Sequence, residues 1–446
     1  MTTPTTALLT DMYELTMIDA ALETGHAERE SVFELFGRRL PAKRRYGVVA
    51  GIARALDAVE NFRFEAAELD YLRSATALSE RTLEYLGDYR FTGTITGYPE
   101  GECYFPGSPL LTVESDFAQG VILETVLLSI LNHDCAIASA ASRMTTAAHG
   151  RPCLEMGARR THEAAAVAAA RAAVVAGFAG SSVLEAGRDY GIKPIGTAAH
   201  SFTLLYDSEE EAFDAQIARM GPQTTLLVDT YDVEQGVQRA VEAARRAGGE
   251  LGAIRLDSGD LIAQAFTVRA QLDALGAHST KITVTSDLDE HAIAALGAAP
   301  VDAYGVGTSV VTGSGHPTAE LVYKLVSRKG ADGTWVPVQK KSASKQTVGG
   351  RKHAGRVIAE GHAAVELIIA SPDAEAATAA LAARGARLLQ VELVRDGEIN
   401  EDHRGPEALA AARERHIAAR NELPYPAWRL SEGEPGIPTV HEQLEE

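Results

Sequence analysis

The chain has 446 residues, of which 46% are hydrophobic and 23% are charged, a balance typical of a folded protein with two or three domains. Its formal net charge of -19 argues against a general role in nucleic-acid or membrane-surface binding, because both need clustered cationic surface. The start, MTTPTTALLTDMYELTM, has no basic region followed by an apolar segment, so we expect no secretory signal and a cytoplasmic protein that does not cross a membrane. Cys103, Cys135 and Cys153 lack metal-ligand spacing, and we expect them to be reduced and buried.

Helical and strand patterns alternate through the first third of the chain. Apolar residues recur at helical spacing in some segments and alternate in the manner of strands in others. The expected helices cover residues 11–22, 51–62 and 120–144, and the expected strands cover residues 31–36 and 92–97. Glycine and proline favour turns between residues 97 and 109. This part of the chain is predicted to form an α+β domain.

Five short apolar runs in the middle of the chain each end in glycine, hydroxyl or carboxylate residues. They cover residues 194–202, 226–232, 253–260, 282–289 and 304–310. Their spacing of roughly one strand-plus-helix unit is expected of a parallel βα barrel, although an open doubly wound sheet would aim its residues similarly. In either fold, the polar residues after the strands would converge on one site.

After about residue 345 the chain returns to alternating strands and alanine-rich helices. The predicted strands cover residues 364–370 and 388–394, and the predicted helices cover residues 374–384 and 406–421. The segment after Leu423 contains four prolines and several glutamates, and we interpret it as a polar tail.

Three carboxylates, Asp229, Asp257 and Asp287, occupy equivalent places on three of the predicted strands. By itself the motif DSGD at residues 257–260 is better explained as a turn, since Asp, Ser and Gly are ordinary turn formers. Three carboxylates that point into one mouth, however, suit a polyhydroxylated sugar and its magnesium ion, because oxygen ligands fit this hard cation.

Candidate anion-binding groups lie at three further places. Gly307 and Thr308 follow a predicted strand with small residues whose N–H groups can approach a phosphate, although a glycine-rich turn without a ligand is the alternative. Arg159 lies near the start of an alanine-rich helix. A cation is unfavourable there because the N-terminal end of a helix is itself positive, and a bound anion would offset this cost. Alternatively, Arg159 forms a salt bridge at the surface. The third place is a run of basic residues, Lys340, Lys341, Lys345, Arg351 and Lys352. This run forms either a solvated loop or a lid over a phosphorylated substrate.

His200 lies just beyond a glycine-hydroxyl strand end, in the motif GTAAHSF. An imidazole there could reach the mouth of the predicted barrel. On sequence alone, a histidine that satisfies the core remains the default interpretation.

Taken together, the motifs resemble those of the nicotinate phosphoribosyltransferase family. They span roughly residues 7–352 in the right order, and they are TDMYELTM, FELFGRR, EGECYFPGSP, EMGARR, GTAAHSF, LLVDTYD, IRLDSGDL, VTSDLDE, YGVGTS and KKSASKQT. The resemblance implies a type II phosphoribosyltransferase fold: an irregular parallel βα barrel with a second α+β domain built from the N- and C-terminal segments. The expected domains are an N-terminal α+β domain over residues 1–136, the barrel over residues 137–345, and an α/β segment over residues 346–446 that packs on the N-terminal domain.

The reaction that the resemblance implies joins nicotinate to phosphoribosyl pyrophosphate (PRPP) and yields nicotinate mononucleotide and pyrophosphate. It is the first step of NAD synthesis from nicotinate and is coupled to ATP hydrolysis through a phosphohistidine. The implied cofactor is Mg²⁺, with ATP as co-substrate, and the implied assembly is a head-to-tail homodimer whose active site lies at the subunit interface. No nucleic-acid or membrane partner is expected.

The resemblance also assigns roles to individual residues of this chain. His200 matches the histidine that is phosphorylated by ATP, and Asp257 and Asp287 would engage ribose or metal. The substrate-binding positions that it implies are Tyr13 and Arg38 from the neighbouring subunit, Met156, Arg159, Ser182, Ser201, Arg255, Gly307, Thr308, Lys341 and Lys345.

The sequence departs from the family pattern at two positions, and three other functions are alternatives to this interpretation. Met156 stands where many relatives have an aromatic ring, and Val183 where relatives tend to have asparagine. Nicotinamide phosphoribosyltransferase, the closest rival, has an acidic residue at the position of Ser182, and a carboxylate there would repel nicotinate. Quinolinate phosphoribosyltransferase lacks the histidine element. A non-catalytic barrel that only binds PRPP or nucleotide is disfavoured by the retention of all these charged elements.

Overall fold

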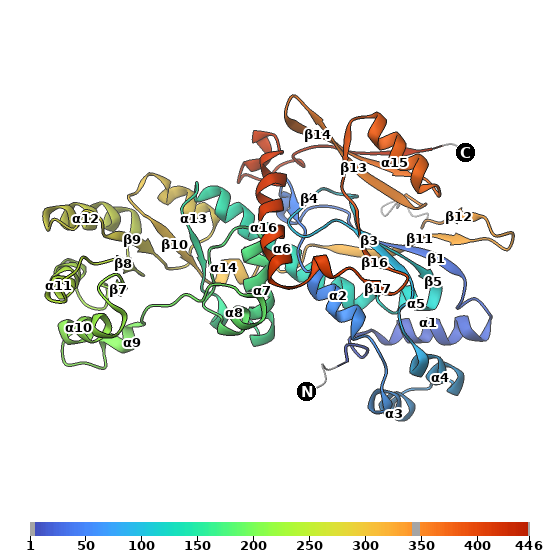
Figure 1. Cartoon of the computed structure of the whole chain (residues 1–446), viewed down its shortest axis with the longest axis horizontal. Coiled ribbons are helices and arrows are strands. Elements are labelled where there is room, and N and C mark those ends of the chain that lie inside the picture. Colours follow the sequence, from blue (N-terminus) through green and yellow to red (C-terminus); the bar gives the residue numbers. More distant parts are fainter. Residues whose placement is uncertain (1–4, 341–347, 445–446) are drawn as a thin grey trace. The chain divides into compact units, whose positions relative to one another are not determined.

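The computed structural model describes residues 5–340 and 348–444. The chain forms two compact units (Figure 1). The terminal unit combines Met1–Ser139 with His316–Glu446, and the central unit consists of Ala140–Gly315. The division therefore falls near residues 139 and 315, and the segment after residue 315 belongs with the two chain ends.

The central unit, all of whose residues the structure describes, contains a five-stranded parallel sheet in the order β6-β10-β9-β8-β7. Its strands are β6 (Cys153–Glu155), β7 (Thr225–Leu227), β8 (Ala253–Leu256), β9 (Lys281–Val284) and β10 (Ala303–Val306). Two single-residue parallel bridges, from Glu155 to Ser181 and from Ser181 to Pro194, continue the sheet beyond β6. The prediction of an α/β arrangement with a parallel sheet is confirmed.

Helices connect the strands of this sheet. They are α7 (Glu163–Val175), α8 (Leu184–Tyr190), α9 (His200–Thr203), α10 (Glu209–Met220), α11 (Val233–Arg246), α12 (Leu261–Ala274), α13 (Glu290–Ala295) and α14 (Thr308–Val311). Helices α10, α11 and α12 lie side by side along the strands β7, β8 and β9 (Figure 1). Because the strands are covered, their apolar residues such as Ile254, Ile282 and Val284 are fully buried.

Four of the five apolar runs contain the strands β7 to β10, but the prediction of a strand in the first run, residues 194–202, is wrong. Pro194 forms only its bridge to Ser181, and helix α9 begins at His200. Proline has no N–H to donate to a strand ladder, and Gly196, Ala198 and Ala199 have low strand propensity.

The terminal unit is built around an antiparallel sheet. Within the described residues this sheet has seven strands, in the order β12 (Trp335–Pro337), β11 (Leu321–Lys329), β1 (Glu30–Gly37), β5 (Pro109–Asp116), β3 (Thr94–Gly97), β16 (Val391–Arg395) and β17 (Glu398–Ile399). A short pair, β2 (Gly47–Val48) and β4 (Cys103–Tyr104), lies apart from it. Its helices are α1 (Met12–Glu23), α2 (Ile52–Glu60), α3 (Ala66–Ala75), α4 (Glu80–Asp88), α5 (Phe117–Val121), α15 (Ala374–Ala383) and α16 (Gly405–Asn421), with α6 (Glu124–Ala147) running into the central unit. The predicted helices and strands of the first third are confirmed.

Helix α6 supplies much of the apolar core of this unit. Residues Phe117–Ala147 are the one stretch of the described chain that is long and apolar enough to cross a membrane, by length and composition alone. Within its most apolar window, 67% of the residues are buried inside the protein. Leu123, Leu127 and Leu131 pack in the same core as Phe33 and Leu35 of β1, as expected of a core helix. The three cysteines are free and buried, as predicted.

A second sheet of the terminal unit corrects two predictions. It contains, among the residues described, β15 (Ala386–Leu388), β13 (Lys352–Ala359), β14 (His362–Ala370) and β18 (Thr439–Gln443). The polar tail thus ends in a strand that pairs in parallel with β14, a backbone contact that composition does not reveal. Lys352, assigned to the basic run, is buried and forms an ion pair with Glu34 of β1.

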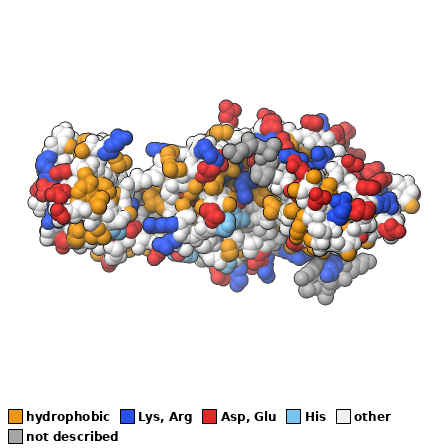
Figure 2. Space-filling model, turned by 90° about the horizontal axis from the view of Figure 1, so that it is seen from below, with side chains coloured by type: hydrophobic (Ala, Val, Ile, Leu, Met, Phe, Trp, Pro, Cys, Tyr) orange, Lys and Arg blue, Asp and Glu red, His pale blue; other side chains and the backbone are white. Residues whose placement is uncertain are grey.

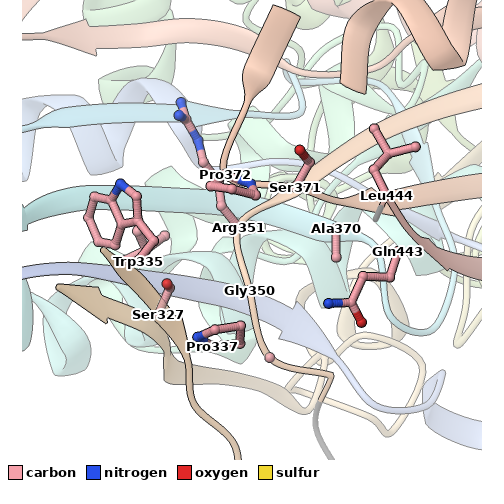
Figure 3. A pocket seen from close by; sticks show the side chains of 12 residues that line it. Ser327, Trp335, Pro337, Gly350, Arg351, Ala370, Ser371, Pro372, Gln443 and Leu444 are labelled. Atoms are coloured by element: carbon pink, nitrogen blue, oxygen red, sulfur yellow. The ribbon is translucent and has the colours of Figure 1, made fainter. Parts of the chain in front are cut away.

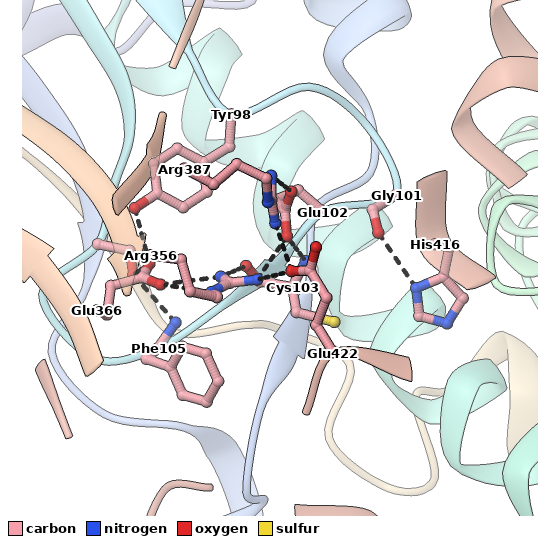
Figure 4. Close-up of polar contacts among 11 residues, drawn as sticks. Tyr98, Gly101, Glu102, Cys103, Phe105, Arg356, Glu366, Arg387, His416 and Glu422 are labelled. Carbon is pink, nitrogen blue, oxygen red and sulfur yellow. Dashed lines mark hydrogen bonds and ion pairs between the residues drawn. The ribbon is translucent and has the colours of Figure 1, made fainter. Parts of the chain in front are cut away.

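A network of buried charges joins residues from both chain ends in this unit (Figure 4). Arg356 of β13 contacts Glu102 at 2.7 Å and Glu366 at 2.8 Å, and all three side chains are at most 1% exposed. Arg387 joins the network by pairing with Glu102 at 2.9 Å and with Glu422 at 2.7 Å. Burial by itself raises the pKa of Glu102, but the charges of Arg356 and Arg387 hold that pKa below its usual value. The network therefore ties the segment before β5 to the C-terminal strands.

We expect the substitution Arg356→Met to lower the free energy of unfolding by about 3–5 kcal/mol, because it leaves buried carboxylates without their cation. Urea unfolding followed by circular dichroism measures the change. The matched control is Arg395→Met, which removes an exposed pair with Glu392 and should cost less than about 1 kcal/mol. Equal unfolding midpoints for the two variants would show that the buried network does not stabilise the unit.

Candidate active site

The loops after β6, β8, β9 and β10 enclose a pocket of about 230 Å³ in the central unit. Its lining residues are Met156, Arg159, Arg160, Arg255, Asp257, Thr285, Ser286, Asp287, Gly305, Gly307 and Thr308. The structure thus brings together most of the candidate residues of this unit, which follow different strands in the sequence. Parallel strands present their carboxyl ends at one edge, and this geometry places the side chains in one mouth.

Arg255 is the best placed anion-binding group of the pocket. Burial lowers its pKa, and the nearby charge of Arg159 lowers it further, whereas Asp257 and Asp229 oppose the change. One terminal nitrogen donates to Thr197 Oγ1 at 2.9 Å. The Nε is buried and has no hydrogen-bond partner within the part of the chain that the structure describes. A guanidinium held in this way keeps donor capacity for an anionic substrate.

Asp229 and Asp257 form a connected pair at the ends of β7 and β8. The Oδ2 of Asp229 accepts hydrogen bonds from the N–H of Asp257 at 2.9 Å and from Ser258 Oγ at 2.7 Å. The hydroxyl of Thr285 donates to Asp257 Oδ1. Asp229 thereby fixes the turn after β8, and Thr285 fixes the carboxylate of Asp257 within the pocket.

His200 lies beside these two carboxylates. Its Nε2 is 3.8 Å from Asp257 Oδ2 and 4.0 Å from Asp229 Oδ1, and its Nδ1 is 3.1 Å from Thr230 Oγ1. The side chain is 40% exposed, so it is not a buried core histidine. Carboxylates on one side and a hydroxyl on the other hold the imidazole in a fixed orientation.

The donor set fits a magnesium ion that is shared with substrate. Across the described residues, no group of three or more His, Cys, Asp and Glu side chains could hold a metal alone. Magnesium usually keeps several waters and binds one or two carboxylates together with substrate phosphates. Asp257 and Asp287, which both line the pocket, can supply such carboxylates.

The other candidate residues that the structure describes lie outside this pocket. Ser182 is half-buried after the bridge at Ser181, and Ser201 is exposed on α9 beside His200. Tyr13 on α1 and Arg38 after β1 are exposed in the terminal unit. Lys341 and Lys345 fall outside the described residues.

Tyr13 is protonated at neutral pH. Partial burial, followed by the charges of Glu124 and Glu14, raises its pKa to about 12. The protonated phenol is a hydrogen-bond donor, and Glu124 is its partner within the chain.

Sequence reasoning missed several residues that shape the site. Thr197 and Thr230 orient Arg255 and His200, and Thr285 orients Asp257. A Cβ on Gly305 would lie 2.8 Å from Met156 Sδ, so glycine lets the methionine cover the pocket there. Each of these residues lies within or beside a motif that carries a candidate residue. Their position next to those motifs is the sequence signal that could have identified them.

A larger pocket of about 520 Å³ lies in the terminal unit (Figure 3). Trp335, Pro372 and Gln443 are among the residues that line it. Its one charged lining residue among those described, Arg351, pairs with Glu114 at 2.7 Å. The smaller pocket is the better candidate for an active site, because arginines and carboxylates both line it. On the face drawn in Figure 2, acidic and basic side chains are intermixed.

Site and fold together define an α/β protein with a candidate anion-binding pocket at the ends of its parallel strands. The model of the nicotinate phosphoribosyltransferase N-terminal domain matches residues 8–132. A nicotinate phosphoribosyltransferase of Mycobacterium tuberculosis is 54% identical over 441 residues, which cover 97% of this chain and 94% of that protein. A Bacillus subtilis nicotinate phosphoribosyltransferase is 37% identical over 79% of this chain and 73% of its own length. The chain belongs to the nicotinate phosphoribosyltransferase family.

A solved structure supports the fold. The crystal structure of human nicotinic acid phosphoribosyltransferase matches with a TM-score of 0.80 at 24% identity and covers 97% of both chains. At this identity the match shows the fold alone.

The turn after β9 is strained. Ser286 and Asp287 have φ angles of 99° and 41°, and side chains rarely adopt this left-handed region. Both residues line the pocket, so the surrounding structure holds this strained turn in the conformation that presents Asp287 there.

We expect Ser286→Gly to raise the free energy of unfolding by about 1 kcal/mol, because glycine adopts positive φ without a Cβ clash. The same change should lower kcat, since the turn would hold Asp287 less firmly. The control is Glu360→Gly, at φ 52° in an exposed hairpin turn of the terminal unit, which should stabilise without affecting turnover. Unchanged kcat in Ser286→Gly would mean that the strain has no role in the site.

Proposed function

We propose that this enzyme joins nicotinate to PRPP and releases nicotinate mononucleotide and pyrophosphate, the first step of NAD synthesis from nicotinate. The observation that carries the proposal is the pocket that Arg159 and Arg255 line together with Asp257 and Asp287. Two cations suit the carboxylate and phosphate groups of the substrates, and two carboxylates suit ribose hydroxyls and a magnesium ion. Membership of the family supports the same reaction.

The pyridine nitrogen attacks the anomeric carbon of the ribose as the bond to pyrophosphate breaks. The nitrogen has a free electron pair, so the step needs little proton transfer, and catalysis consists mainly of positioning and charge stabilisation. Met156 covers the pyridine, and Arg255 binds an anionic group. Gly307 and Thr308 bind the ribose phosphate through backbone N–H groups. Asp257 and Asp287 hold ribose hydroxyls and stabilise positive charge that develops on the sugar ring.

Mg²⁺ and ATP complete the proposed reaction. Asp257 and Asp287 would hold the magnesium ion, which would balance the charge of the leaving pyrophosphate. His200 accepts the γ-phosphoryl group of ATP and releases it to water as phosphate. Thr230 engages Nδ1, so Nε2 faces the carboxylates and is the nitrogen that we assign to this transfer.

We also propose a domain arrangement and a dimeric assembly for this enzyme. The bridges from Glu155 to Ser181 and on to Pro194 support a sheet that curves into an irregular barrel within the central unit, Ala140–Gly315. The terminal unit, to which β11 and β12 also belong, would form the second domain. In a cytoplasmic homodimer, Tyr13 and Arg38 would reach the pocket of the neighbouring subunit, and Lys341 and Lys345 would bind phosphate. Ser182 and Ser201 would contact substrate from the rim.

With PRPP, Mg²⁺ and ATP, we expect the purified enzyme to consume nicotinate at least about 100-fold faster than nicotinamide, because the arginines favour the acid and Ser182 offers no carboxylate to the amide. Liquid chromatography of the mononucleotide products measures both rates. Preference for nicotinamide would assign the rival activity, and no turnover of either would favour a binding protein. In the same assay, His200→Ala should lose stimulation by ATP, whereas His278→Ala, an exposed histidine on the central unit, should keep it.

A further inference from the structure

Glu155, at the end of β6, is a buried carboxyl group that the proposed mechanism does not use. Its residue is 0% exposed. Its two oxygens accept hydrogen bonds from different segments, Oε1 from the N–H of Gly157 and Oε2 from Ser181 Oγ at 2.5 Å. Burial raises its pKa, and the two hydrogen bonds oppose that rise. One side chain thus links the segment after β6, part of which lines the pocket, with the segment around Ser181.

The first link fixes the turn that carries Arg159. The carbonyl oxygen of Gly157 accepts from the N–H of Arg160, which starts the short 3-10 helix Ala158–Arg160. A Cβ on Gly157 would lie 2.8 Å from the carbonyl oxygen of Gly307, so this turn packs closely under the proposed phosphate-binding turn. Held through its N–H, Gly157 sets the position of Arg159.

The second link fixes the segment that carries Ser182. Besides donating to Glu155, the hydroxyl of Ser181 accepts from the N–H of Val183 at 3.0 Å. The N–H of Ser182 donates to the backbone carbonyl of Glu155 at 2.9 Å. Ser182 therefore lies between two residues whose positions both depend on Glu155.

We propose that Glu155 is a positioning residue that sets the preference for the acid substrate by holding Arg159 and Ser182 at a fixed separation. This inference rests on the proposed function, and Glu155 itself does not contact the substrate. Nicotinate and nicotinamide differ only in a carboxylate against an amide, so their discrimination depends on where the charged and polar groups of the rim stand. A misplacement of about 1 Å can cost on the order of 100-fold in rate, so a rigid link is needed.

The test uses Glu155→Gln, which keeps the size of the side chain. Its amide oxygen can still accept from Gly157, but its NH₂ group cannot accept from Ser181 and can only donate to that hydroxyl, so a neutral hydrogen bond replaces the one to the carboxylate. We expect KM for nicotinate to rise about tenfold and the nicotinate-to-nicotinamide ratio of kcat/KM to fall about as much, as for one lost hydrogen bond to a charged group. KM for PRPP and the melting temperature should change little.

Ser181→Ala removes the same hydrogen bond from the other side and should reproduce the loss of selectivity. In the double variant the two losses should not add, because they break one link. Glu163→Gln, at an exposed carboxylate at the start of α7, is the matched control and should behave like the wild type.

Unchanged nicotinate KM and selectivity in both variants would overturn the proposal, as would a lower melting temperature with unaltered kinetic constants. If Glu155→Gln does not fold, the nicotinate KM and selectivity of Ser181→Ala alone test the proposal. A wild-type enzyme without nicotinate turnover would instead contradict the proposed function, so the two failures are distinguishable.

Discussion

The site depends on the parallel pairing of the five strands in the central sheet. This pairing places residues that are widely separated in sequence at one edge of the sheet. There, side chains that follow one strand form hydrogen bonds with residues that follow the neighbouring strand. Asp229 accepts from the backbone of Asp257, and Thr285 donates to the carboxylate of Asp257. Each strand end therefore orients its neighbour, and the pocket is a product of the sheet rather than of any single loop.

Buried charge has different roles in the network around Arg356 and in the strand-end pocket. In the terminal unit, Arg356 is fully paired with Glu102 and Glu366, and its role is to hold distant segments together. In the central unit, Arg255 Nε and Asp229 Oδ1 are buried without hydrogen-bond partners in the described chain. Unpaired polar atoms in a pocket cost free energy in the absence of ligand. A substrate or metal that supplied the missing partners would recover it, as expected of a binding site.

Much of the central fold was predictable because buried strands and the polar residues after them leave a local pattern, as in the motifs that contain Asp257 and Gly307. The wrong predictions have a common cause, because the features that were missed depend on tertiary contacts. Nothing local shows that Lys352 is buried against Glu34, or that β18 pairs with β14. Glu155 was equally hidden, because its importance lies in partners that the fold supplies. The residues that orient the site, such as Thr285, carry no chemistry that a motif would single out.

We propose that the strand-end pocket of the central unit binds the reacting groups. A crystal structure with nicotinate mononucleotide bound tests this most directly. We expect ribose hydroxyls at Asp257 and Asp287 and the phosphate at Gly307 and Thr308. Nucleotide bound instead in the larger pocket beside Trp335, with the strand-end pocket empty, would contradict it.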